Sequence, residues 1–238
     1  MENSARILFL HHSTGECIWK AGAKEWFDKY NSDNGKNYKV TDFDFPKARP
    51  YGWSNNPYDY WNIWVKNASD IPFMEEPTLE MLTKEYDLIM FKHCFPVCNI
   101  QEDTGTPDAG STEKRVENYK LQYKELKEKL HSFPETRFII WTGAALVQAR
   151  TNEKSARLVR EFFEWVKNEW DEKSDNIFIW DFYELETEGS IYLRREHAFS
   201  ESDSHPNENF SKKTVPLLCQ RIVNVLEGKG DSTGLTGK

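Results

Sequence analysis

Arg6-Ile7-Leu8-Phe9-Leu10 is an apolar, strand-like run that ends abruptly in His11-His12-Ser13-Thr14-Gly15. Comparable runs rich in β-branched and aromatic residues recur between helical stretches, and the set covers residues 6–11, 38–43, 86–92, 136–142 and 177–182. Strands that alternate with helices in this way are typical of a parallel α/β sheet. We therefore expect an α/β fold with a parallel sheet of five strands.

Amphipathic helices are predicted around the fourth strand. Apolar residues recur at three- and four-residue steps from Val116 to Leu130 and again from Leu158 to Trp170, which is the spacing of one buried helix face. A last helix ends at Gly228, and the residues after it are rich in Gly, Ser and Thr. We expect a single domain over residues 1–228 and a disordered tail over residues 229–238.

Charge and composition narrow the classes of partner. The formal net charge is -8, and Lys and Arg are interleaved with Glu along the predicted helices. Phosphate contact needs a concentrated basic face, so we expect neither a nucleic acid nor a membrane as partner. No apolar run approaches the roughly 18 residues of a membrane span, and no secretory signal is recognisable. These features predict a cytoplasmic protein whose cysteines are free thiols.

Polar residues come directly after several predicted strands. Ligands of an open parallel sheet bind beyond the carboxyl ends of its strands, and Ser13 follows the first strand there. The loop Asp203-Ser204-His205-Pro206-Asn207 precedes the last helix and adds a carboxylate and an imidazole. Serine becomes a nucleophile at neutral pH when an imidazole accepts its proton and a third group orients that imidazole. We predict Ser13 as nucleophile, His205 as base and Asp203 as the orienting carboxylate.

These two segments resemble blocks of the SGNH (GDSL-like) hydrolase superfamily, and the resemblance spans about residues 6–227. It is carried by Leu8-Phe9-Leu10-His11-His12-Ser13 and by the Asp203–Asn207 loop. The resemblance implies a three-layer α/β/α sandwich whose five-stranded parallel sheet has the flavodoxin-like strand order 2-1-3-4-5. It also implies an esterase that works through an acyl-enzyme without a metal or another cofactor. By position, it also implies that Gly52 is an oxyanion-hole glycine. We expect hydrolysis of a short acyl ester, such as an acetyl group, on a small-molecule or carbohydrate alcohol.

The sequence departs from the family pattern around both segments. His11-His12 stand where the family usually has Gly-Asp, and Asp203 lies two residues before His205 where three are usual. The usual asparagine after the third strand is replaced by Lys92-His93-Cys94. We expect Asn99 or His93 to take its place at the oxyanion, with His12 as a further hydrogen-bond donor.

Two other functions fit parts of the sequence. A non-catalytic binding module would keep the fold but lack the active geometry. A metal-dependent hydrolase would need three converging ligands and an open position. The sequence offers such ligands in His11, His12, His93, His205, Asp203, Asp181 and Cys94.

An aromatic-rich segment over residues 44–76 interrupts the alternation of strands and helices. Its Trp53, together with Trp19 near the serine, can offer a flat surface on which a sugar ring or an acyl chain packs. The alternative is that most aromatic residues of this segment fill the core beneath a long loop.

Overall fold

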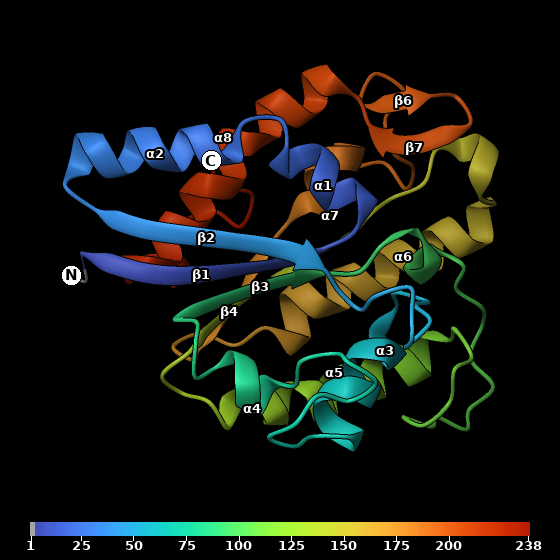
Figure 1. The fold of residues 1–238 in the computed structure, drawn as a ribbon. Coiled ribbons are helices and arrows are strands. Elements are labelled where there is room, and N and C mark those ends of the chain that lie inside the picture. Colours follow the sequence, from blue (N-terminus) through green and yellow to red (C-terminus); the bar gives the residue numbers. More distant parts are fainter. Residues whose placement is uncertain (1–2) are drawn as a thin grey trace.

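The computed structural model describes residues 3–238 as a parallel sheet covered by helices on both faces (Figure 1). The sheet has the order β2-β1-β3-β4-β5, and each neighbouring pair is parallel. Its strands are β1 (Ser4–His11), β2 (Asn37–Asp44), β3 (Leu88–Lys92), β4 (Arg137–Trp141) and β5 (Ile177–Trp180). The predicted fold class and strand order are confirmed.

Two helical layers cover the sheet (Figure 1). One contains α1 (Ser13–Trp19), α2 (Ala23–Asn34), α7 (Phe182–Thr187) and α8 (Glu208–Leu226). The other contains α3 (Pro57–Trp61), α4 (Leu79–Leu82), α5 (Val116–His131) and α6 (Glu153–Trp165). None of the helices within residues 3–238 is both long and apolar enough to cross a membrane.

The side chains of β1 alternate between the two layers. Ile7 and Phe9 pack with the first layer, whereas Leu8 and Leu10 pack with the second. Successive residues of a strand point to opposite faces, so a strand covered on both sides must be apolar at every position. This requirement explains the unbroken apolar runs of the sequence.

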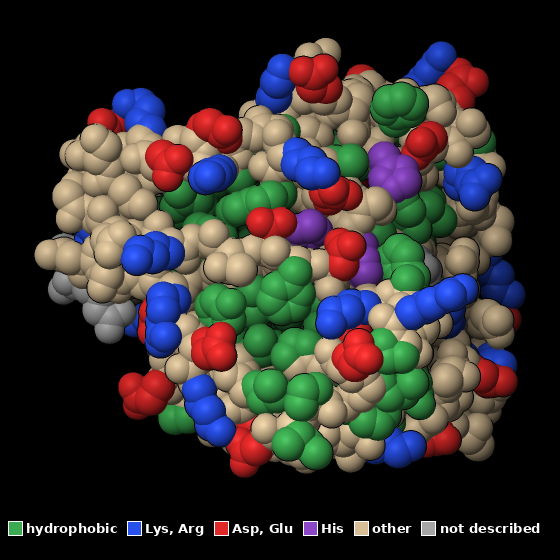
Figure 2. Space-filling view, in the orientation of Figure 1, with side chains coloured by type: hydrophobic (Ala, Val, Ile, Leu, Met, Phe, Trp, Pro, Cys, Tyr) green, Lys and Arg blue, Asp and Glu red, His purple; other side chains and the backbone are tan. Residues whose placement is uncertain are grey.

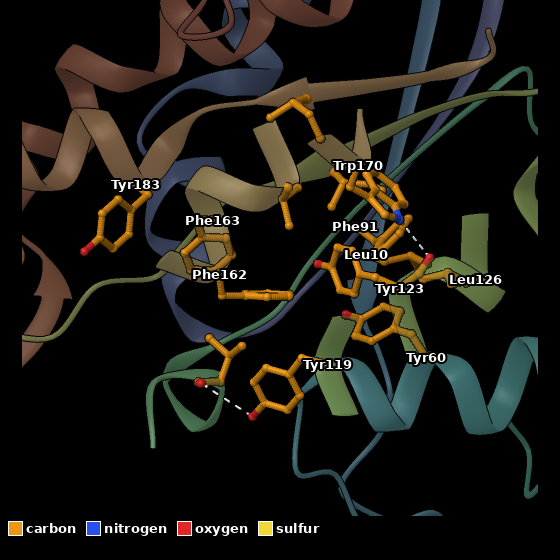
Figure 3. Packing of buried hydrophobic residues seen from close by; sticks show 14 of the residues in the cluster. Leu10, Tyr60, Phe91, Tyr119, Tyr123, Leu126, Phe162, Phe163, Trp170 and Tyr183 are labelled. Carbon is orange, nitrogen blue, oxygen red and sulfur yellow. Dashed lines mark hydrogen bonds between the residues drawn. The ribbon is translucent and has the colours of Figure 1, made fainter. Parts of the chain in front are cut away.

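The second layer has an aromatic core (Figure 3). Tyr60, Tyr123 and Trp170 are fully or almost fully buried there, and the Trp170 indole N–H donates to the Tyr123 carbonyl at 2.8 Å. Tyr60 and Trp64 come from the aromatic-rich segment, which folds into α3 and the short π-helix η1 (Asn62–Lys66). These two rings therefore fill the core instead of lining a cleft.

A small antiparallel hairpin lies outside the main sheet, where a loop is predicted. It consists of β6 (Ala198–Ser200) and β7 (Asp203–Pro206). Asn207 follows β7 directly and caps α8, because its side-chain oxygen accepts the N–H of Phe210 at 2.9 Å. The hairpin thus connects the predicted base to the start of a long helix.

Residues 229–238, predicted to be a disordered tail, make defined contacts with the end of β5. The Asp181 N–H donates to the Leu235 carbonyl at 2.9 Å, and the Trp180 indole donates to the Thr236 carbonyl at 3.1 Å. Arg221 of α8 donates to the Gly230 carbonyl at 2.6 Å. An edge strand has backbone groups that lack a partner strand, and the tail supplies acceptors at this edge.

Candidate active site

The structure places the predicted nucleophile, base and carboxylate side by side. Ser13 begins α1 directly after β1, and Asp203 and His205 lie on β7. Ser13 Oγ is 2.9 Å from His205 Nε2, and His205 Nδ1 is 2.6 Å from Asp203 Oδ1. One chain of hydrogen bonds, called the catalytic chain below, therefore joins the hydroxyl to the carboxylate.

The two-residue spacing of Asp203 and His205 suits an extended strand. Residues two apart in a strand point to the same face, so the carboxylate lies beside the imidazole. The same carboxylate oxygen also accepts the backbone N–H of His205 at 2.9 Å. β7 thus orients the imidazole without the three-residue spacing that the resembling family usually has.

The protonation states follow from these contacts. The backbone N–H and the imidazole of His205 lower the pKa of the Asp203 carboxyl, because hydrogen bonds to the charged form favour it. An ionised carboxylate only accepts hydrogen bonds, so His205 Nδ1 donates to it. In the neutral imidazole, Nε2 then accepts from the Ser13 hydroxyl, which is the arrangement a general base needs.

The position of Ser13 depends on close packing between α1 and β1. A Cβ added at Gly15 would lie 2.5 Å from the Cβ of His11, so the helix can approach the strand this closely only with glycine there. As the first residue of α1, Ser13 has a backbone N–H without an intrahelical acceptor. That N–H is available to an oxyanion.

A pocket of about 440 Å³ opens beside His205. The Phe95 ring packs edge-on against the imidazole, with ring centroids 4.9 Å apart. The side chains of His205 and Asp203 are 34% and 42% exposed, so a substrate can reach them. Figure 2 shows histidine side chains at the surface beside acidic ones, with basic side chains interspersed. The pocket is lined by Phe95, Asn99, Leu146, Arg150, Ser202, Asp203, Ser204 and His205.

The expected oxyanion residues lie in three different surroundings. Asn99 is exposed and shares the pocket with His205. Gly52, with a φ of 82°, lines a separate pocket of about 280 Å³ whose lining includes no member of the catalytic chain. His93 is fully buried and lies 2.7 Å from the Tyr123 hydroxyl, in the aromatic core. Its Nε2 is thus occupied by Tyr123, and His93 does not line the pocket beside His205.

His12 and the two expected tryptophans also lie outside the pocket lining. The His12 ring packs against Trp53 with centroids 3.9 Å apart. Burial, with help from the Lys92 charge, lowers the pKa of His12 to about 3, so this imidazole is neutral at pH 7. Trp19 packs against Phe9, with centroids 5.9 Å apart. The Trp53 ring therefore shields His12, the residue before Ser13, from solvent. Trp19 is partly buried and packs against the core.

A set of buried polar residues around Cys94, absent from the predicted site, is called the inner polar group below. Its members are Asn55, Lys92, Cys94 and Glu186, all buried. Cys94 Sγ lies 3.9 Å from Ser13 Oγ, and the Cys94 N–H donates to the Asn55 carbonyl at 3.3 Å. Within residues 3–238, no hydrogen-bond partner exists for the Asn55 amide, Lys92 Nζ or Glu186 Oε1.

The charges of the inner polar group influence one another. Burial raises the pKa of Glu186 well above its ordinary value and so favours the protonated carboxyl. Burial alone would raise the pKa of the Cys94 thiol, but the Lys92 cation and the Thr14 hydroxyl lower it. The only sequence signals for this group were a lysine at the end of an apolar strand and the Asn-Asn-Pro turn at residue 55.

The histidines and acidic residues do not converge as metal ligands. Among residues 3–238, no three His, Cys, Asp or Glu side chains are grouped to hold a metal ion. His11 instead pairs with Asp42 at 3.1 Å, and His93 contacts Tyr123. The ligand set of the metal-dependent alternative is therefore divided among separate contacts.

Comparisons with known proteins show the fold. No protein-family model matches the chain, and no curated protein matches its sequence. An acetyl xylan esterase is structurally similar with a TM-score of 0.51 and 11% identity, over 88% of this chain and 96% of that one. An alpha/beta hydrolase enzyme from the metagenome of Lake Arreo, Spain, has a TM-score of 0.50 and 11% identity, over 94% and 96%.

A third similar structure is a gut microbial diltiazem-metabolizing enzyme, with a TM-score of 0.52 and 11% identity. The match covers 98% of this chain but 48% of that enzyme, so this chain spans about half of its length. The chain therefore has an α/β architecture that is also found in an acetyl xylan esterase and in an alpha/beta hydrolase.

Proposed function

We propose that the chain is a divergent SGNH-like serine esterase that removes a short acyl group, such as acetyl, from a carbohydrate-like alcohol. The observation that carries the proposal is the catalytic chain, with 2.9 Å from Ser13 Oγ to His205 Nε2 and 2.6 Å from His205 Nδ1 to Asp203. The structural similarity to an acetyl xylan esterase supports an acetylated carbohydrate as substrate class.

The catalytic chain can perform acyl transfer in two steps. Ser13 Oγ attacks the ester carbonyl while His205 Nε2 takes its proton, and Asp203 stabilises the imidazolium that forms. The imidazolium then returns the proton to the leaving alkoxide, which leaves an acyl-enzyme on Ser13. In the second step, His205 takes a proton from water while the water oxygen attacks the acyl carbon. The imidazolium then returns this proton to Ser13 Oγ as the bond between the acyl carbon and Oγ breaks, which releases the free acid and restores Ser13.

The oxyanion of both steps needs donors that face the carbonyl oxygen. We assign one donor to the Ser13 N–H and a second to the Asn55 amide. The side-chain amide of Asn55 supports this role because it has no hydrogen-bond partner among the described residues. The backbone carbonyl of Asn55 accepts the N–H of Cys94, whose sulfur contacts Ser13. A buried amide without a partner is costly, and a substrate oxygen would satisfy it.

Turnover of p-nitrophenyl acetate by Ser13→Ala tests the proposal. We expect a loss of about 1,000-fold or more, whereas Ser202→Ala is the matched control, because Ser202 lines the same pocket outside the catalytic chain. Full activity of Ser13→Ala would exclude the serine mechanism. Turnover that a chelator removes and a divalent metal restores would favour the metal-dependent hydrolase. Absence of turnover on a panel of acetyl esters would favour a binding module.

A further inference from the structure

The wall of the pocket beside His205 carries a guanidinium. Arg150 ends the short helix η3 (Gln148–Arg150) and lines the pocket together with Asn99, Asp203 and His205. Its side chain is exposed, and in the described part of the chain it makes no ion pair or side-chain hydrogen bond. Arg150 is close enough to help lower the pKa of Asp203, although the two form no ion pair.

Other basic residues of this region have acidic partners. Arg194 Nη2 lies 2.8 Å from Glu196, and Arg195 Nη2 lies 2.5 Å from Glu201. Both arginines line a neighbouring pocket of about 580 Å³, to which Gln148 of η3 also contributes. In a chain with a net charge of -8, acidic partners are plentiful. Arg150 is thus the arginine of this region whose charge is left for a ligand.

The mechanism indicates which part of an ester lies near this charge. His205 returns its proton to the leaving alkoxide, so the alcohol part of the substrate must lie next to the imidazole. The pocket that His205 lines is the space for that alcohol. A planar guanidinium with five N–H donors binds a carboxylate through two parallel hydrogen bonds, and the Asn99 amide offers a further donor.

Resting on the proposed function, we propose that Arg150 makes this pocket a subsite for an anionic group on the alcohol part of the ester. The preferred substrate class is then an acyl ester of an acidic alcohol, such as an acetylated sugar that bears a carboxylate. Asp203 lines the same pocket, but its charge is directed to the imidazole by two hydrogen bonds. The carboxylate of the substrate is therefore held on the Arg150 side.

Two acetate esters that differ only in charge test the subsite. They are 4-acetoxybenzoate, whose leaving alcohol carries a carboxylate, and its neutral methyl ester. We expect Arg150→Gln to lower kcat/KM about tenfold for 4-acetoxybenzoate, through a raised KM, and less than twofold for the methyl ester. Arg195→Gln is the matched control, because it removes an equal charge from the neighbouring pocket.

An equal loss for both esters in Arg150→Gln would overturn the subsite. A selective loss for 4-acetoxybenzoate in Arg195→Gln as large as that in Arg150→Gln would also overturn it, because it would indicate a general effect of surface charge. Calorimetric titration with the product 4-hydroxybenzoate provides a readout without turnover. If the wild type hydrolyses no ester, the proposed function fails, yet 4-hydroxybenzoate binding that Arg150→Gln weakens about tenfold would still support the subsite. Equal binding by both proteins would overturn it.

Discussion

Ser13 contacts two groups of polar residues, the catalytic chain through His205 and the inner polar group through Cys94, and the two groups differ in solvation and in hydrogen bonding. The catalytic chain is hydrogen-bonded from end to end, and its His205 and Asp203 are partly exposed. The inner polar group is buried, and several of its polar atoms have no partner within residues 3–238. Proton transfer requires connected groups near water, whereas charge stabilisation requires donors that are already desolvated. We therefore assign proton transfer to the outer group and oxyanion stabilisation to the inner one.

Removal of the base, His205, should cause the largest loss of activity among the variants of the two groups. We expect His205→Ala to lose about 1,000-fold or more of its esterase turnover, with part of the loss restored by added imidazole because the pocket is open. The matched control is His131→Ala, since His131 forms a similar pair with Asp175 at 2.9 Å, and its ring has no hydrogen bond to a serine within residues 3–238. Initial rates with p-nitrophenyl acetate measure both, and an active His205→Ala would assign proton transfer elsewhere.

The orienting carboxylate should have the next largest effect. Asp203→Asn keeps the shape but cannot hold Nδ1 as a donor in the same way, so Nε2 no longer accepts from Ser13. We expect kcat to fall about 100- to 1,000-fold, with little change in the free energy of unfolding because the side chain is partly exposed. Activity within threefold of the wild type would show that β7 orients the imidazole without the carboxylate.

The inner polar group contributes the third effect. Asn55→Gly removes the amide without backbone strain, because Asn55 has a φ of 51° that glycine adopts readily. We expect kcat to fall about 100-fold with KM nearly unchanged. Asn99→Ala is the comparison, because this exposed amide lines the pocket beside His205. If Asn99→Ala lowers kcat and Asn55→Gly does not, the oxyanion donor is Asn99 in the pocket beside His205.

Buried histidines should make stability depend on pH. Burial lowers the pKa of His93 from 6.5 to about 3, so the unfolded chain binds a proton in this window that the folded chain refuses. Stability therefore falls as pH drops from about 6.5 toward 3, by at most about 1.4 kcal/mol per pH unit for this one group. Urea unfolding at pH 6.5, 5.5 and 4.5 should show a smaller slope for His93→Gln. Parallel curves would mean that His93 does not provide this dependence.

The fold is predictable because β1, β3, β4 and β5 are short, largely apolar runs, as expected of strands covered on both faces. The residues of the catalytic chain could also be chosen from the sequence, because a hydroxyl after β1 and an imidazole before α8 both lie at the carboxyl edge. Their catalytic roles stay predictions. The hairpin is not predictable from this stretch, because Ser, Asp and Pro near residue 203 favour turns over strands.

The oxyanion residues were harder to predict, because their roles depend on which way side chains point. His93 follows β3 in sequence, yet its ring enters the aromatic core and contacts Tyr123. Gly52 matches a family position, but it lines a different pocket. Asn55 has no periodic signal, since the role proposed for it rests on a contact of its backbone carbonyl with Cys94, far along the chain. Loop geometry of this kind is set by tertiary packing and not by local pattern.

The β6–β7 hairpin has one further consequence. Asp203 and His205 are two residues apart on one strand, so their mutual hydrogen bond travels with them as a rigid unit. Ser13 lies on a different element, α1, which packs closely against β1 at Gly15. The site therefore forms where α1 and β7 meet, and one distance, from Ser13 Oγ to His205 Nε2, describes whether it is assembled.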